Sequence, residues 1–132
     1  MDEKLKKLLQ RQENNPFARA AGICVTSADE DGVVCEMEVE DHCMNHLGFV
    51  HAGALYTLAE NAAGAAAFHR DGRRYVTQGG GIHYIGNQKG GRLRATAQVV
   101  HGGRQTCLVR TIVSGEGGKL ICTGEFDFFC VD

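Results

Sequence analysis

The sequence has no excess of charge of one sign. Its 14 lysine and arginine residues nearly balance 16 aspartate and glutamate residues, which gives a formal net charge of -2, and no long run of like charges occurs. Proteins that bind nucleic acid or anionic membranes usually carry a basic cluster for that purpose. We therefore expect neither a nucleic acid nor a membrane as a partner.

Long apolar runs are also missing. No stretch approaches the roughly 18 apolar residues of a membrane span. The N-terminal sequence MDEKLKKLLQRQ is too charged for a signal peptide. The length suits one domain over residues 1–132, in which residues 1–15 are expected to hold an amphipathic helix. We predict a cytoplasmic protein.

Paired motifs that hold metals or disulfides are scarce. The six cysteines include no CxxC pair. Of the six histidines, only His42 and His46 share an i,i+4 spacing, and they fall in a segment expected to be a loop. We therefore expect most of the cysteines to be reduced residues that pack in the core, and we expect no metal site.

Charge itself is scarce between residues 42 and 69, where Glu60 is the only formally charged side chain. The pattern predicts a loop to about Val50 and then a helix from about Ala52 to Phe68. That helix is apolar or small nearly all round, which is typical of a helix buried on all sides.

Glu60 points about 140° away from Leu55 around this helix, so the two residues face different neighbours. A buried carboxylate without a partner must be paired, neutralised or used, because burial disfavours its charged form. One interpretation is an ordinary surface glutamate. The other, which the lack of further charge on this side favours, is a cavity against a second protein surface, most simply another copy of the chain.

Strand patterns lie on both sides of the helix. A hairpin begins at Ile23 and turns at residues 29–32. Four further runs follow without another helix: Tyr75 to Ile85, Arg92 to His101, Gln105 to Val113 and Lys119 to Val131. Short turns make neighbouring strands antiparallel, so the sequence predicts an α+β domain with one buried helix against an antiparallel sheet.

The loop before the helix carries an amide and imidazoles, including Asn45 and His51. Free N–H groups at a helix N-terminus can stabilise a developing oxyanion. Asn45 also fits a loop cap and His51 a helix cap, so a structural and a catalytic role are both open for each residue.

Residues 45–53, NHLGFVHAG, followed by residues 58–60, LAE, resemble the signature of hotdog-fold acyl-CoA thioesterases of the PaaI and 4-hydroxybenzoyl-CoA thioesterase type. Those enzymes read N/Q-x-x-G-x-x-H-G-G, with an acid nine residues after the histidine. The resemblance implies a hotdog fold, in which a curved antiparallel sheet wraps around one long central helix. It also implies homodimers that assemble into a homotetramer, with the sites between protomers.

The resemblance further implies the catalytic roles. Glu60 would be the nucleophile or general base toward the thioester of an acyl-CoA. Asn45 and His51 would position the substrate or the attacking water, and the backbone N–H of Ala52 would polarise the thioester carbonyl. No cofactor is then required, because coenzyme A is part of the substrate.

Two positions depart from the family pattern. Ala52 replaces the first glycine of the family's HGG, and it keeps the N–H while allowing less backbone freedom. Gly64, four residues after the acid, stands where several members carry a serine or threonine that assists the attacking water. Water handling is therefore expected to differ from that of those members.

Other residues are expected to contact substrate. Gly53 and Gly64 would line the site, His83 would lie near the acyl group, and Arg104 would bind the phosphates of coenzyme A, with Lys89 and Arg92 as weaker candidates. Each cation also fits a solvated surface role, and His83 a structural one.

Three functions compete. The first is hydrolysis of an acyl-CoA to free acid and coenzyme A. The second is a non-catalytic acyl-CoA-binding hotdog domain, which the changes at Ala52 and Gly64 favour. The third is a hotdog hydratase or dehydratase, which pairs a histidine with an acid on a related scaffold.

Overall fold

The low-charge segment forms the long helix α3, Ala52–Asp71, in a computed structural model that describes residues 2–132. His51 caps its first turn, and Gly72 ends it at φ 75°, a left-handed conformation that glycine adopts without strain. The whole run of residues 61–67 is buried. The prediction of a buried helix is confirmed, although the helix continues three residues beyond the expected end at Phe68.

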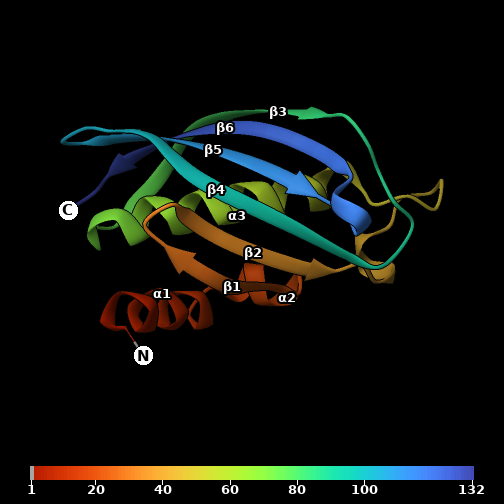
Figure 1. The fold of residues 1–132 in the computed structure, drawn as a ribbon, viewed down its shortest axis with the longest axis horizontal. Coiled ribbons are helices and arrows are strands. Elements are labelled where there is room, and N and C mark those ends of the chain that lie inside the picture. Colours follow the sequence, from red (N-terminus) through yellow and green to blue (C-terminus); the bar gives the residue numbers. More distant parts are fainter. Residues whose placement is uncertain (1) are drawn as a thin grey trace.

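Six strands form one antiparallel sheet, which curves around α3 (Figure 1). In the sheet the strands follow the order β1-β2-β4-β5-β6-β3. The strands are β1 Ile23–Asp29, β2 Gly32–Glu38, β3 Tyr75–Tyr84, β4 Arg92–Gly102, β5 Thr106–Ser114 and β6 Leu120–Cys130. Two 3-10 turns, Asp41–Cys43 and Glu116–Gly118, complete the loops. The predicted α+β class, with a curved sheet around one central helix, is confirmed.

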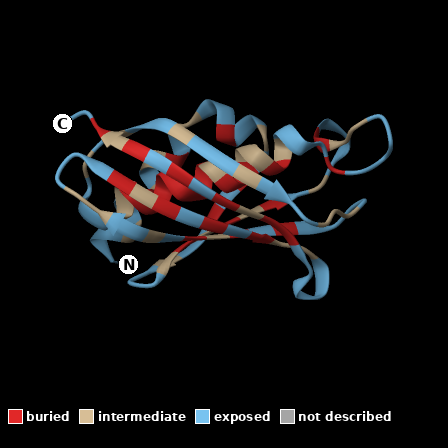
Figure 2. Cartoon of the chain, turned by 90° about the horizontal axis from the view of Figure 1, so that it is seen from above, coloured by how far each residue is buried: buried red, intermediate tan, exposed pale blue. Residues whose placement is uncertain are grey.

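The core lies between the concave face of the sheet and α3. Along β2, the buried residues Val33, Cys35 and Met37 alternate with residues that are less buried, and Figure 2 shows the same alternation of red and paler residues along the strands. The fully buried Thr111 of β5 donates a hydrogen bond of 3.1 Å from Oγ1 to the backbone oxygen of Ala59. This bond ties the helix to the sheet directly beside Glu60.

The strand β3 lies at one edge of the sheet and pairs only with β6. The chain leaves it through residues 85–91 and enters β4 in the middle of the sheet, beside β2. Sequence patterns predicted turns between consecutive strands, but they did not predict the pairings of β2 with β4 and of β3 with β6. An edge strand presents unpaired backbone groups to which another chain can add.

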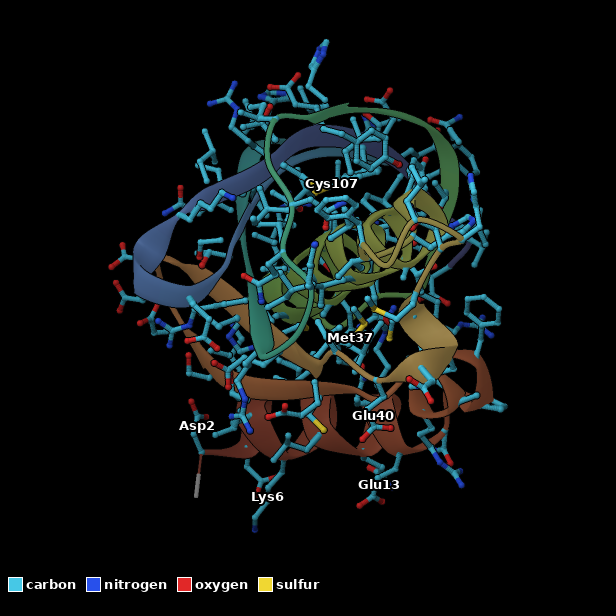
Figure 3. The ribbon with its side chains drawn as sticks, turned by 90° about the vertical axis from the view of Figure 1, so that its right-hand side faces the viewer. Asp2, Lys6, Glu13, Met37, Glu40 and Cys107 are labelled. Carbon is cyan, nitrogen blue, oxygen red and sulfur yellow. The ribbon has the colours of Figure 1, made fainter. Side chains whose placement is uncertain are left out.

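Two helices precede the sheet. The predicted N-terminal helix is present as α1, Glu3–Glu13, with Leu8 buried, and Figure 3 shows Lys6 and Glu13 on its opposite side, pointing away from the sheet. A second helix, α2, Pro16–Ala20, was not predicted, because the sequence around Pro16 was interpreted as a break. Asn15 caps α2 and Pro16 occupies its first turn, where the missing N–H costs nothing.

No helix within residues 2–132 is long and apolar enough to cross a membrane.

Candidate active site

Glu60 is half-buried in a cavity of about 410 Å³ on the side of α3 that faces α1, α2 and β3. The cavity is lined by Arg11, Asn15, Phe17, Tyr56, Thr57, Glu60, Asn61, Gly64 and Thr77. Thr77 of the edge strand donates a hydrogen bond of 3.0 Å from Oγ1 to Glu60 Oε1. The carboxylate is therefore held at one oxygen, while the cavity gives a small molecule access to it.

A guanidinium from far away in the sequence shares this cavity. Arg11 of α1 stacks on the ring of Phe68, with its central carbon 5.6 Å from the ring centre. Its Nη2 atom lies beside Gly64, one helical turn after Glu60. Burial lowers the pKa of Arg11 from its ordinary value, and the negative charge of Glu60 partly opposes that shift.

A short chain of amides fixes α1 and α2 against the central helix. Asn15 Nδ2 donates to Asn61 Oδ1 at 3.3 Å, and Asn61 Nδ2 donates to Gln12 Oε1 at 3.5 Å. Because Asn61 follows Glu60 and Gln12 follows Arg11, this chain holds the part of α1 that carries Arg11 against the part of α3 that carries Glu60.

The N-terminus of α3 forms a second polar feature. His51 Nδ1 accepts a hydrogen bond of 2.8 Å from the N–H of Gly53, so the proton of a neutral imidazole lies on Nε2. A Cβ atom at Gly53 would come within 3.0 Å of His51 Nδ1, which explains the glycine there. The N–H of Ala52, at the first helical position, meets no acceptor among residues 2–132 and remains available to a ligand.

Asn45 is engaged within its own loop. Its Oδ1 atom accepts from the N–H groups of Leu47 at 2.9 Å and Phe49 at 3.1 Å. The amide NH₂ group of Asn45 is left to donate elsewhere. Asn45 and His51 thus both have the capping contacts that the sequence left open, and each keeps one donor.

Glu60 and Ala52 of one chain cannot act on the same atom. Eight residues separate them on a straight helix, which corresponds to ~12 Å at 1.5 Å per residue. An oxyanion donor must lie within about 3 Å of the reacting oxygen. A cavity of about 330 Å³ lined by His51 and Gly53 adjoins the Glu60 cavity through Phe17 and Thr57, but it does not bring the two groups together.

Comparison with known proteins identifies the family to which the chain belongs. A family model described as Domain of unknown function (DUF4442) matches residues 4–127. The acyl-coenzyme A thioesterase PaaI of Escherichia coli (strain K12) is 37% identical over 95 residues, which cover 71% of this chain and 67% of PaaI. The chain belongs to the hotdog-fold thioesterases.

Solved structures of this superfamily superpose closely. The structure of the E. coli PaaI protein matches with a TM-score of 0.91 and 26% identity, over 98% of this chain and 94% of that one. A hypothetical thioesterase from Streptococcus pneumoniae TIGR4, solved with coenzyme A, matches with a TM-score of 0.83 and 25% identity, over 91% and 96% of the two chains. The hotdog fold implied by the residues around Glu60 is thus confirmed.

Within this hotdog thioesterase fold, one chain does not gather every predicted site residue. Gly64 lines the Glu60 cavity, and Gly53 lies at the N-terminus of α3. His83 lies on the other face of the sheet, in a cavity of about 560 Å³ that it shares with Arg110. Arg104 is exposed in the turn between β4 and β5, near the far end of α3, where Arg70 Nη2 donates to the backbone oxygen of Gly103 at 3.3 Å.

The two weaker candidates for phosphate binding have partners of their own. Lys89 Nζ lies 5.0 Å from the ring centre of Phe49, close to the loop before α3. Arg92 pairs with Glu38, at 2.6 Å between Nη2 and Oε1, and more loosely with Glu36. Arg92 is therefore already paired with carboxylates, whereas Lys89 contacts an aromatic ring near the helix N-terminus.

Sequence reasoning missed Arg11 and Thr77 as parts of the Glu60 cavity. Arg11 reads as one of several charges on an amphipathic helix, and Thr77 as one of many strand threonines. A signal existed only for Arg11, since the absence of any cation near Glu60 in the sequence implied a partner from elsewhere. Residues 2–132 contain no group of three or more His, Cys, Asp or Glu side chains arranged to hold a metal ion.

Proposed function

We propose that the protein is an acyl-CoA thioesterase that hydrolyses the thioester at a site shared between two copies of the chain. Glu60 of one copy would act as the nucleophile or general base, and the Ala52 N–H of the other would stabilise the oxyanion. The observation that carries this proposal is the half-buried Glu60 carboxylate, held by Thr77 in a cavity that a substrate can enter. The thioesterases found among relatives and structural neighbours support the same reaction.

The edge strand β3 supports the sharing of sites. Near one end its Thr77 contacts Glu60, and at the other end Tyr84 donates a hydrogen bond of 3.0 Å from its hydroxyl to the backbone oxygen of Ala52. If two β3 edges pair antiparallel about a two-fold axis near Gly80, the Thr77 end of each copy lies beside the Tyr84 end of the other. That pairing brings Glu60 of one copy toward the Ala52 helix end of its partner.

The chemistry needs only groups that the chain supplies. In the general-base route, Glu60 takes a proton from water as the water oxygen bonds to the thioester carbon. The carbonyl oxygen gains negative charge and is stabilised by the Ala52 N–H. The intermediate then expels the thiolate of coenzyme A, which takes the proton back from Glu60. In the nucleophilic route, an oxygen of Glu60 bonds to the thioester carbon and expels the thiolate of coenzyme A, which leaves a mixed anhydride. Water then hydrolyses the anhydride to the free acid and the Glu60 carboxylate, and the proton that is released goes to the thiolate.

His51 and Asn45 would position the reactants. Each uses one polar atom for its cap and keeps a donor, Nε2–H on the imidazole and NH₂ on the amide. These donors suit the substrate carbonyl or the attacking water. No metal ion or separate cofactor enters this scheme, and we further propose a cytoplasmic homodimer that associates into a homotetramer.

A panel of short, medium and aromatic acyl-CoA substrates tests the reaction. We expect purified protein to release free thiol from at least one class of acyl-CoA, followed with a thiol reagent, and the free acid in equal amount. Light scattering on the same sample would give the oligomeric state.

Two results would contradict the proposal. Tight binding of intact acyl-CoA without thiol release across the whole panel would favour a non-catalytic binding domain. The lack of a serine or threonine at Gly64 favours this alternative. Gain or loss of conjugated absorbance with 2-enoyl or 3-hydroxyacyl thioesters, without thiol release, would favour a hydratase or dehydratase.

Thr77 is expected to position Glu60. In Thr77→Val the side chain keeps its shape and its preference for a strand but loses the hydroxyl that donates to Glu60 Oε1. Since one hydrogen bond is worth roughly 0.5–1.5 kcal/mol, kcat should fall about two- to tenfold. Steady-state kinetics should show this fall in kcat with KM little changed, and Thr77→Ser should restore most of the rate. An equal loss in Thr77→Ser would indicate packing rather than the hydroxyl.

A further inference from the structure

The guanidinium of Arg11 lines the Glu60 cavity, and protein groups leave part of it without a partner. Its Nη1 atom is buried and meets no hydrogen-bond acceptor among residues 2–132. A buried donor without an acceptor is costly, and more so when it is charged. The stacking on Phe68 occupies a face of the guanidinium and leaves the N–H edge open.

Glu60 lines the same cavity as Arg11, but no salt bridge or hydrogen bond joins the two side chains within residues 2–132. Arg11 also borders a smaller cavity of about 170 Å³, shared with Gly64, Phe68, Arg74 and Tyr75. Two acids contact lining residues of this cavity, and both are already bound. Asp71 accepts from the hydroxyl of Tyr75 at 2.7 Å, and Asp132 pairs with Arg74 Nε at 2.6 Å.

Gly64 makes room for the guanidinium. A Cβ atom at this position would come within 3.3 Å of Arg11 Nη2, so any larger residue would crowd Arg11. Gly64 follows Glu60 by four residues, and the helix therefore advances ~6 Å between the reacting carboxylate and the guanidinium. A short acyl chain that runs along α3 can span that distance.

We propose that Arg11 is a specificity residue, which selects acyl-CoA substrates whose acyl group ends in a carboxylate, that is, monothioesters of short dicarboxylic acids. The planar fork of the guanidinium matches the two oxygens of a carboxylate. The thioester carbon would lie at Glu60 and the distal carboxylate at Arg11. This inference rests on the proposed thioesterase function.

Matched substrate pairs test the inference. Succinyl-, glutaryl- and adipoyl-CoA are compared with butyryl-, valeryl- and hexanoyl-CoA, which have the same carbon numbers but no terminal charge. We expect the wild-type kcat/KM to be higher for at least one dicarboxylic member than for its partner. In Arg11→Met, which keeps the length but loses the charge and the donors, that ratio should fall about ten- to hundredfold.

Three further variants separate specificity from packing. Arg11→Lys keeps the charge without the fork and should give an intermediate ratio. Gly64→Ala should lower the ratio by displacing the intact guanidinium. Lys7→Met, at an exposed position of the same helix, should leave the ratio as in the wild type. A purely structural Arg11 would lower the rates for both members of a pair alike, and an unchanged ratio in Arg11→Met would overturn the inference.

The two proposals can fail separately. If uncharged acyl-CoAs are hydrolysed but the ratio does not respond to Arg11→Met, the specificity role is wrong and the thioesterase function stands. If no acyl-CoA is hydrolysed, the thioesterase function is wrong, and calorimetry of glutaryl-CoA and valeryl-CoA binding to the wild type and to Arg11→Met decides the role of Arg11. Equal affinities of the two proteins for glutaryl-CoA would then overturn it.

Discussion

Replacement of Glu60 by glutamine is expected to lower kcat for thioester hydrolysis by at least about 10²–10⁴-fold, the usual contribution of a positioned general base. Glutamine has nearly the same size, and its amide oxygen can still accept the hydrogen bond that Thr77 donates. It can neither take a proton from water nor attack a carbonyl carbon. The measurement is thiol release with the best substrate of the panel, under saturating conditions.

A control shows whether the loss is specific. Glu13→Gln removes a carboxylate from the exposed side of α1, which Figure 3 shows pointing away from the sheet, and should leave kcat as in the wild type. Circular dichroism and thermal unfolding of both variants should match the wild type. If Glu60→Gln keeps its kcat within about threefold, a positioned base is excluded and the role proposed for Glu60 is wrong.

Replacement of Ala52 by proline is expected to lower kcat about 10²–10³-fold, since it removes the one N–H proposed as the oxyanion donor. Proline is well tolerated at the first position of a helix, where this N–H has no partner within the helix. His51, at ψ 138°, already has the extended backbone that a residue before proline requires. The change thus removes this donor, puts a ring carbon of proline in its place and has little effect on the helix.

Ala52→Gly is the matched control for this prediction. It restores the residue of the family pattern, keeps the N–H and should retain activity. If Ala52→Pro folds, as judged by circular dichroism, and retains wild-type kcat, the Ala52 N–H is not the oxyanion donor.

A mixture of the two inactive variants tests the shared site. When Glu60→Gln and Ala52→Pro proteins are unfolded together and refolded, half of the dimers contain one chain of each kind. In such a dimer one site has both defects, and the other combines an intact Glu60 with an intact Ala52. The mixture should therefore regain about a quarter of the wild-type activity if the dimer is two-fold symmetric. Sites made within one chain would regain none.

Local sequence patterns predicted much of this fold. The absence of charge around Glu60 indicated that α3 is buried, and residues 61–67 are buried throughout. Alternation of apolar and polar residues placed the strands within a residue or two of their observed ends. Such patterns show which residues of a helix or strand face the core and which face solvent, and this follows mainly from local periodicity. The short helix α2 was not predicted, because a proline such as Pro16 can either end a helix or begin one.

The residues of the candidate site were also predicted only in part from the sequence. The spacing of His51, Ala52 and Glu60 is a local property of one loop and one helix, so the sequence alone identified these residues and the family that shares them. The sequence also identified Glu60 as the lone charge of its segment. It could not show that Thr77 holds one oxygen of this carboxylate, because the two residues meet only through the pairing of β3 with β6.

Only the tertiary structure brought Arg11 to the Glu60 cavity. In the sequence Arg11 is one charge among several on an amphipathic helix, forty-nine positions before Glu60. The amides of Gln12, Asn15 and Asn61 fix that helix against α3, and the missing side chain of Gly64 leaves space for the guanidinium. The sequence by itself determined the buried helix, the strands and the lone carboxylate, since these follow from short-range patterns, and the family resemblance implied how the strands wrap around the helix. The tertiary structure decided what surrounds the carboxylate, since those neighbours come from segments that meet only when the chain is packed.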